Sequence, residues 1–256
     1  MAIMENRICC FVADVHLGLD YKSPNDRESK FVDFLRNLPS GVTDLFLLGD
    51  IFDFWYEYKY VIPNKFIKTL SALSDLTSKG VKIHFFNGNH DIWTYRFFQQ
   101  ELGVEFFDSP CVLNINGKKL FLAHGDALWE RDKKYLVLQK IFKSKFLQFL
   151  FSSIHPRWAF GLGYHWSKHN RLTHDMSREE YESLKEKVSK EGKDWAEKYQ
   201  KSSEEKVDYF IMGHYHIPLT EQLEDGSQFL MLGDWIHHPD YLILEGDNIR
   251  RVNLYL

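Results

Sequence analysis

The sequence predicts an α/β protein in which short buried strands alternate with amphipathic helices. Apolar runs rich in Phe, Ile, Val and Leu end at Gly or Asp, which is typical of strands buried on both faces. Between them, apolar residues recur with helical spacing; these faces consist of Phe31, Phe34, Leu35 and Leu38, and of Phe66, Leu70 and Leu73. Alternating strands and helices favour a sheet whose functional loops lie at the carboxyl ends of its strands.

The predicted strands follow in order along the chain. They lie within residues 8–14, 44–50, 82–91, 119–126, 208–216, 228–234, 241–246 and 249–256. Each of the first five runs into a polar cluster. The last three are closely spaced, with turn signals at 224–226 and 245–248, so we expect hairpins that extend a mixed sheet or form a second one.

The segment from about residue 129 to 206 interrupts this pattern and is predicted to be a helical insertion. It begins with helical spacing, breaks around residues 155–157 and 161–163, and resumes as a charged helix over residues 177–200. We therefore divide the chain into a body, residues 1–128 and 207–256, and an insertion, residues 129–206.

The composition excludes disorder, collagen and coiled coil. The 256 residues are 44% hydrophobic and 27% charged, as in an ordinary globular protein. Cys9 and Cys10 adjoin in an apolar run, which favours reduced core thiols over a disulfide framework. No signal peptide and no run of 18 apolar residues is evident, so we expect a cytoplasmic protein of undetermined oligomeric state.

The net charge of −4 is unevenly distributed. Residues 129–206 hold 17 Lys and Arg against 12 Asp and Glu, or +5, which leaves 15 against 24, or −9, for the remainder. Residues 133–174 hold eight Lys and Arg and no acid, together with nine aromatic residues. An acidic body with a basic, aromatic insertion indicates that the two parts bind different things.

Polar side chains gather where five of the predicted strands end. In chain order they are Asp14, His16, Asp50, Asn89, His90, Asp91, His124, His214 and His216. In an extended chain, side chains two apart share a face, so we expect Asp14 and His16 to point the same way. Taken singly, each is more often a turn or surface residue, but five such motifs in order favour a site.

Mixed nitrogen and oxygen ligands without cysteine suit a catalytic metal site better than a structural zinc site. Seven of these residues could serve as ligands, which is too many for one catalytic ion. If one carboxylate bridges, two divalent ions about 3.5–4 Å apart follow, an arrangement suited to phosphoryl displacement. We expect Mn²⁺, with Fe or Zn²⁺ as alternatives. We exclude His237 and His238 as a further metal pair, because adjacent strand residues point to opposite faces.

Together these motifs resemble the signature of the calcineurin-like metallophosphoesterases. They are Asp14-x-His16, Gly49-Asp50-x-x-Asp53, Gly88-Asn89-His90-Asp91, His124-Gly125 and Gly213-His214-x-His216. The resemblance implies a four-layer α/β/β/α sandwich of two sheets flanked by helices, here with a helical lid.

The same resemblance implies how the polar residues share two ions. One ion would be held by Asp14, His16, Asp50 and His216, and the other by Asp50, Asn89, His124 and His214. Asp50 would bridge, and a hydroxide activated by the ions would attack phosphorus. His90, oriented by Asp91, would stabilise the developing charge or protonate the leaving oxygen.

Within that superfamily, three stretches resemble the UDP-2,3-diacylglucosamine pyrophosphatases of lipid A biosynthesis. They are ADVHLG, GDIFDFW and HGDALWERDKKY. The resemblance implies hydrolysis of a lipid-linked sugar nucleotide to UMP and 2,3-diacylglucosamine 1-phosphate. It implies substrate contacts from Asn89, His90, Asp132, Tyr135, Ser167, Lys168, Arg171 and His214. Many members of that family carry Arg where this chain has His90.

The insertion favours a lipid substrate independently. Acyl chains need an apolar groove, a pyrophosphate needs cations, and a membrane-dissolved substrate needs a face that docks on the inner-membrane surface. The alternative is that the aromatics are the insertion's own core and the lysines its solvated rim. Basic and aromatic residues also bind single-stranded nucleic acid, but the acidic protein disfavours that partner.

Two other functions remain open from the sequence. One is a generic phosphodiesterase that acts on nucleotides or nucleic-acid ends. The other is a non-catalytic module that binds a membrane or a partner, which the intact set of metal ligands disfavours.

Overall fold

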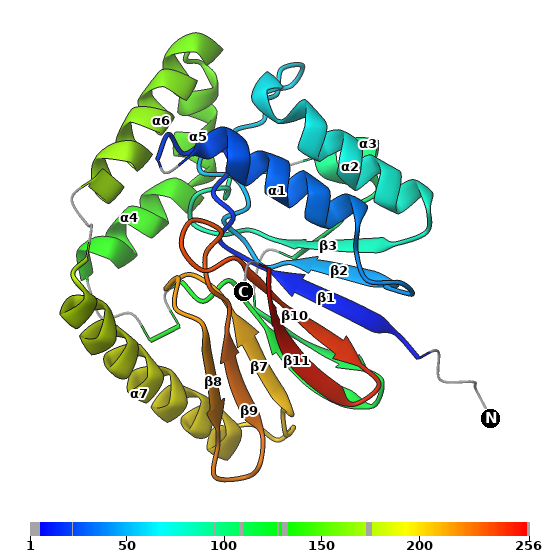
Figure 1. The fold of residues 1–256 in the computed structure, drawn as a ribbon. Coiled ribbons are helices and arrows are strands. Elements are labelled where there is room, and N and C mark those ends of the chain that lie inside the picture. Colours follow the sequence, from blue (N-terminus) through cyan, green and yellow to red (C-terminus); the bar gives the residue numbers. More distant parts are fainter. Residues whose placement is uncertain are drawn as a thin grey trace.

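Two mixed β-sheets lie face to face in the computed structural model, with helices on the outer side of each (Figure 1). The structure describes residues 6–21, 23–94, 96–107, 110–126, 128–129, 133–172 and 176–254, without the side chains of residues 166–172. The α/β class and the two-sheet sandwich predicted from the sequence are confirmed.

The first sheet has six strands in the order β11-β10-β1-β2-β3-β4. These are β1 (Ile8–Val12), β2 (Asp44–Leu47), β3 (Lys82–Phe86), β4 (Glu105–Phe107), β10 (Asp240–Glu245) and β11 (Asn248–Asn253). Strands β1 to β4 are parallel, and the hairpin β10–β11 adds to them antiparallel. The carboxyl ends of β1, β2 and β3 therefore meet at one edge.

The second sheet has five strands in the order β5-β6-β7-β9-β8. These are β5 (Cys111–Ile115), β6 (Lys118–Leu122), β7 (Tyr209–Met212), β8 (Leu219–Gln222) and β9 (Gln228–Met231). Its centre, β6-β7-β9, is parallel and both edge strands are antiparallel. The expected hairpin β10–β11 exists, whereas β9 pairs with β8, a strand that the sequence analysis did not predict, and the two hairpins lie in different sheets.

Apolar side chains from both sheets fill the space between them. Phe11 and Phe46 stack with ring centroids 4.9 Å apart, and Leu122 and Ile211 of the second sheet join the same buried cluster. Cys9 also faces this interior, where its thiol is free. Burial without a disulfide is what the apolar run around Cys9 predicts.

The outer face of the first sheet is covered by α1 (Pro24–Arg36), the short η1 (Asn64–Phe66), α2 (Ile67–Ser78) and α3 (Phe97–Leu102) (Figure 1). Phe31 and Leu35 are fully buried beneath α1, and Leu73 beneath α2, as their helical spacing predicts. Leu38 packs against the same cluster but lies beyond the end of α1.

Helix α7 (Arg178–Ser202) covers the outer face of the second sheet (Figure 1). It begins with a capping box in which Ser177 and Glu180 exchange hydrogen bonds, close to the predicted start. Val188 and Ala196 are buried in the cluster of the second sheet, and Gly192 lies so close to Phe229 that a Cβ would approach its ring to 2.4 Å. Although it belongs to the predicted insertion, α7 thus forms the fourth layer.

Helices α4 (Lys133–Lys143), α5 (Lys145–Ser152) and α6 (Pro156–Leu172) form a separate cap beside the two sheets (Figure 1). The predicted break at 161–163 is wrong, because α6 runs through both glycines. Close packing explains why position 163 is a glycine, since an added Cβ would lie 2.5 Å from the Phe54 ring. The body and the cap share one aromatic cluster, which contains Phe54, Tyr56, Trp93, Phe142, Phe151, Phe160 and Tyr164.

Replacing Gly192 by Leu should lower the free energy of unfolding by about 1–3 kcal/mol, because the new side chain must displace Phe229. Lys190→Leu, on the exposed side of α7, serves as the control and should change stability little. Denaturant unfolding measures both. Equal stability of the two variants would contradict the assignment of α7 to the sandwich.

Candidate metal centre

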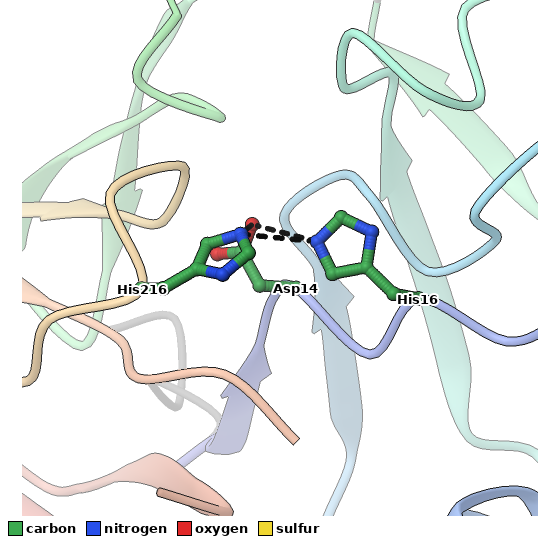
Figure 2. A group of neighbouring side chains, drawn as sticks. All are labelled: Asp14, His16 and His216. Carbon is green, nitrogen blue, oxygen red and sulfur yellow. Dashed lines mark hydrogen bonds and ion pairs between the residues drawn. The ribbon is translucent and has the colours of Figure 1, made fainter. Parts of the chain in front are cut away.

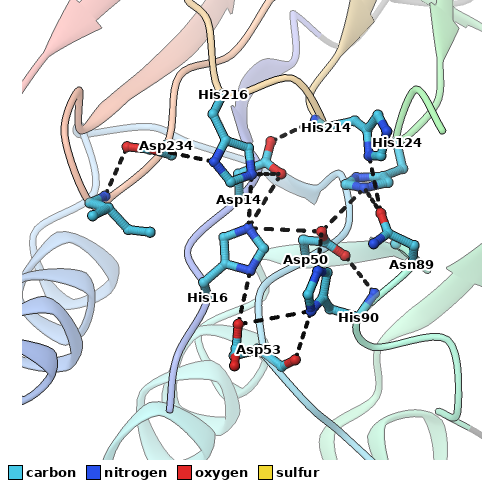
Figure 3. A network of polar contacts seen from close by, with 12 residues as sticks. Asp14, His16, Asp50, Asp53, Asn89, His90, His124, His214, His216 and Asp234 are labelled. Carbon is cyan, nitrogen blue, oxygen red and sulfur yellow. Dashed lines mark hydrogen bonds and ion pairs between the residues drawn. The ribbon is translucent and has the colours of Figure 1, made fainter. Parts of the chain in front are cut away.

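The loops after the parallel strands of both sheets converge on one group of polar side chains (Figure 3). Asp14 and His16 follow β1, Asp50 follows β2, and Asn89 and His90 follow β3. From the second sheet, His124 follows β6, and His214 and His216 follow β7. The structure therefore brings together all seven residues that the sequence proposed as ligands.

Five of these residues adopt a left-handed backbone conformation that non-glycine residues seldom occupy. The φ angles are 54° for Asp14, 51° for His16, 53° for Asp50, 77° for His214 and 60° for His216. Asp14 and His16 converge as expected, but they do so through left-handed backbone at each residue and not as neighbours on one face of an extended chain. Such conformations cost on the order of 1–3 kcal/mol each and are typical of functional sites.

The first group of ligand atoms comes from Asp14, His16 and His216 (Figure 2). Asp14 Oδ2 accepts the backbone N–H of His214, whereas Oδ1 is buried without a hydrogen-bond partner. Oδ1 lies 3.4 Å from His216 Nε2 and 3.7 Å from His16 Nε2, and these two nitrogens are 3.1 Å apart. A buried carboxylate oxygen facing two imidazole nitrogens is a donor set that fits a divalent cation.

The second group surrounds Asn89 and His124. Asn89 Oδ1 lies 3.1 Å from His124 Nε2 and 3.0 Å from His214 Nδ1. His124 Nδ1 donates to the carbonyl of Leu48, which leaves the lone pair that a metal requires on Nε2. These atoms also fit a divalent cation.

Asp50 lies between the two groups. Its Oδ1 accepts the backbone N–H of His90, and its Oδ2 lies 3.8 Å from His16 Nε2 and 3.5 Å from His124 Nε2. A Cβ at Gly88 would come within 2.2 Å of Asp50 Oδ1, so only glycine permits this approach. Asp50 is thus placed to contact ions in both groups, and Asp14 lies close enough to join Asp50 and His124 in a further potential ligand group.

At the site, neighbouring groups of opposite charge offset the effect of burial on the pKa values of the carboxylates and of His216. Burial alone would raise the pKa of Asp14 and of Asp50, but neighbouring imidazoles hold both below their usual value. Burial opposes protonation of His216, yet Asp14 and Asp234 raise its pKa to about 9. His214 behaves differently, since burial and the adjacent His124 lower its pKa to about 4. Bound cations would supply the positive charge that these buried carboxylates require.

Asp234 supports the first group and was not singled out in the sequence. Its buried carboxylate lies 3.1 Å from His216 Nδ1 and 3.0 Å from His237 Nδ1. A carboxylate on the second imidazole nitrogen fixes the orientation of a metal ligand. The signal was available, because Gly233-Asp234 follows β9 as Gly49-Asp50 follows β2.

Asp234→Asn should therefore weaken metal binding by about 10–100-fold, because the His216 ring loses its anionic partner. Competition with a chromophoric chelator measures this affinity. Asp247→Asn, an exposed position in the β10–β11 turn, provides the control. Unchanged affinity in Asp234→Asn would show that His216 needs no such support.

The expectation that Asp91 orients His90 is wrong. The Asp91 carboxylate is fully buried and accepts the backbone N–H groups of Asp50, Ile51, Phe52 and Gly88. Burial raises the pKa of Asp91 to about 7. Asp91 thus holds the two ligand loops together.

Asp53 is the residue that orients His90. Its backbone carbonyl accepts the His90 Nδ1 proton at 2.9 Å, and its carboxylate lies 3.8 Å from His90 Nδ1 and 3.6 Å from His16 Nδ1 (Figure 3). His90 Nε2 lies 4.0 Å from Asp50 Oδ2. Asp53 belongs to the Gly-Asp-x-x-Asp motif, but its spacing alone does not reveal which imidazoles it contacts.

The substrate-binding residues expected in the insertion are described only in part. Tyr135 lines a cavity of about 160 Å³ beside Asn89 and His90, and its ring centroid is 6.1 Å from that of His214. Asp132 lies outside the described residues. Ser167, Lys168 and Arg171 lie on α6, but their side chains are outside the described part.

Comparison with known proteins places this site in a family. Residues 9–218 match the model of the calcineurin-like phosphoesterases. The UDP-2,3-diacylglucosamine hydrolase of Porphyromonas gingivalis is 31% identical and aligns over 93% of this chain and 94% of its own length. The enzyme of the same name from Psychromonas ingrahamii is 26% identical over 96% and 98% of the two chains.

The UDP-2,3-diacylglucosamine hydrolase from Aeromonas salmonicida is 34% identical over 55% of this chain and 54% of its own length. The matched residues 9–218 include Asp14, Asp50, His124 and His216. The chain therefore belongs to the calcineurin-like phosphoesterase family and is a metal-dependent phosphoester or pyrophosphate hydrolase.

Proposed function

We propose that the chain hydrolyses the pyrophosphate of UDP-2,3-diacylglucosamine to UMP and 2,3-diacylglucosamine 1-phosphate. The observation that carries this proposal is a pair of neighbouring, largely apolar cavities, one beside the metal centre and one under the cap. The names of the relatives support the same substrate. Tyr135, with Asp132, Ser167, Lys168 and Arg171, remains the proposed contact set on the insertion.

The apolar space under the cap has two neighbouring parts. The part of about 160 Å³ adjoins Asn89 and His90, and a second of about 280 Å³ lies between α4, α5 and α6. They share the walls Phe54, Trp93, Phe142 and Gly163. An acyl chain can fill such a space along its length, whereas a nucleotide or nucleic-acid end has no long apolar chain to do so.

The outer surface of the cap supports docking on a membrane. Large apolar side chains are exposed there, among them Phe146 and Phe149, each 68% exposed, and Trp158, which is 73% exposed. Other aromatics of the cap, such as Phe142 and Phe160, pack on the body, so the core explanation covers only part of the set. Exposed apolar rings among lysines, with no acid over 133–172, fit an anionic lipid surface.

We propose from this surface that the protein associates peripherally with the cytoplasmic face of the inner membrane. Among the described helices, none combines the length and apolar composition needed to span a bilayer. Lysines near an anionic leaflet gain about 1 kcal/mol each, which favours reversible surface binding.

The chain's own residues position the reaction. Divalent cations held by the two ligand groups, Mn²⁺ in our proposal, would polarise the phosphoryl oxygens. Because the Asp53 carbonyl accepts the Nδ1 proton of His90, Nε2 is the ring nitrogen left to give a proton to the leaving oxygen, which it does from the doubly protonated imidazolium form. Asp53 fixes the ring, and the apolar cavity excludes water from one side of the bond.

Gly163→Ala should lower kcat/KM for the lipid substrate by about tenfold or more, because the new methyl group meets Phe54 and shifts α6 at the mouth of the cavity. Gly161→Ala is the matched control, since nothing lies within 4 Å of its Cβ position. Steady-state kinetics of both variants measures the effect. Equal kcat/KM values for the two variants would show that the packing of α6 against the body does not affect hydrolysis of the lipid substrate.

The proposed substrate is tested by comparing UDP-2,3-diacylglucosamine with UDP-glucosamine that lacks acyl chains, using the Mn²⁺-loaded protein. The acylated substrate should have much the larger kcat/KM, because binding of remote groups positions the pyrophosphate. Replacing residues 133–172 with a Gly/Ser loop should remove that preference and spare bis-p-nitrophenyl phosphate. Equal rates for both UDP-sugars in the unaltered chain would favour a generic phosphodiesterase.

A further inference from the structure

A second, larger cavity also opens on the metal centre, and α7 and the loop after β9 contribute to its walls. Its volume is about 730 Å³, within the range of small-molecule sites. Asn89 and His90 line both this cavity and the apolar one, so the two meet at these residues. A substrate with its scissile phosphate at the metal centre would extend one half into each cavity.

The walls of the second cavity differ in chemistry from those under the cap. Tyr181 and Arg178 of the first turn of α7 contribute, as do Tyr21, His237 and His238. Tyrosine and histidine rings pair along the wall: Tyr181 and His238 have centroids 5.6 Å apart, and Tyr21 and His237 6.4 Å. Flat rings beside hydrogen-bonding groups suit a nucleobase and a ribose, and would leave polar groups unpaired against an acyl chain.

Asp234 fixes this wall to the metal centre. Besides its contacts with the His216 and His237 rings, its carboxylate accepts the backbone N–H groups of Ile236 and His237. Residues 236–238 are therefore held in a fixed position relative to the ligand His216. A rigid wall at a set distance from the scissile phosphate is what recognition of a nucleoside on that phosphate requires.

We propose that this second cavity binds the nucleoside 5′-monophosphate half of the substrate, with the base against Tyr181 and His238. The inference rests on the proposed function, because only a pyrophosphate with two unlike halves would use both cavities. The structure places His237 and His238 in the turn before β10 and not in a strand, so the sequence argument that they point to opposite faces is wrong. Both line the second cavity, and the inference gives them a place in nucleotide recognition.

The test compares UMP with ribose 5-phosphate as ligands of the Mn²⁺-loaded full chain by isothermal titration. Both carry the same sugar phosphate, so their affinity ratio isolates the base. UMP should bind at least about tenfold more tightly, since stacking of a base on aromatic rings has that magnitude. Tyr181→Ala and His238→Ala should reduce this ratio towards one, whereas Tyr181→Phe should retain it.

Tyr60→Ala provides the control, because Tyr60 is 85% exposed and does not line the second cavity. The inference is overturned if UMP and ribose 5-phosphate bind equally to the unaltered chain. It is also overturned if Trp93→Ala, under the cap, removes the preference while Tyr181→Ala and His238→Ala keep it.

Failure of this inference is distinguishable from failure of the proposed function. If the chain hydrolyses UDP-2,3-diacylglucosamine but the Tyr181 and His238 variants keep the full UMP preference, the nucleotide lies elsewhere and only the inference fails. If those variants lose the preference but the lipid substrate is not hydrolysed, the nucleotide cavity stands and the lipid assignment fails.

Discussion

Asp50→Asn is expected to abolish hydrolysis of every phosphoester that the protein cleaves. Asp50 Oδ2 lies between His16 and His124 of the two ligand groups, so the substitution removes a negative charge placed to contact both ions. The loss should exceed the about 10–100-fold typical of a residue that only supports a ligand. Asn89→Ala should have a similar effect through the second ion alone. Hydrolysis of bis-p-nitrophenyl phosphate and metal content per chain measure both variants.

The control for Asp50→Asn is Asp75→Asn, which changes an exposed carboxylate of α2. Near-normal turnover and two bound ions in Asp50→Asn would contradict the bridging role. Loss of one ion in Asn89→Ala with retention of the other would support two separate groups of ligands.

His90→Ala is expected to lower kcat by about 10²–10⁴ while both ions remain bound. The reason is positional: Asp53 fixes the ring through Nδ1, and the ring lines both cavities where they meet. Metal content separates this role from another, since His90 also forms a potential ligand group with His16 and Asp50. An ion lost with His90 would identify it as a ligand, and unchanged kcat would remove it from the reaction.

Most of the fold could be predicted because local patterns encode it. Runs such as 8–12 are apolar at every position, and the spacing of Phe31 and Leu35 matches a helix that packs on a sheet. Partner choice between strands could not be predicted, since it depends on distant segments: β9 joins β7, whereas β10 joins β1. The predicted break at residues 161–163 was wrong in part because a contact with Phe54, far away in sequence, favours glycine within the helix at position 163.

The candidate site, like the fold, could be predicted from the sequence only in part. Strand-end motifs predicted which residues converge, since parallel strands bring their carboxyl ends to one edge. The motifs could not predict which carboxylate contacts which imidazole. Asp91 is adjacent to His90 in sequence yet bonds to four backbone N–H groups, whereas Asp53 and Asp234 reach the imidazoles through turns that no spacing specifies.

The most direct test of the account is release of UMP by the purified Mn²⁺-loaded chain supplied with UDP-2,3-diacylglucosamine. The account predicts one UMP and one 2,3-diacylglucosamine 1-phosphate per turnover, with no release by Asp50→Asn under the same conditions. It would be contradicted if the unaltered chain cleaves bis-p-nitrophenyl phosphate but leaves the lipid-linked substrate intact.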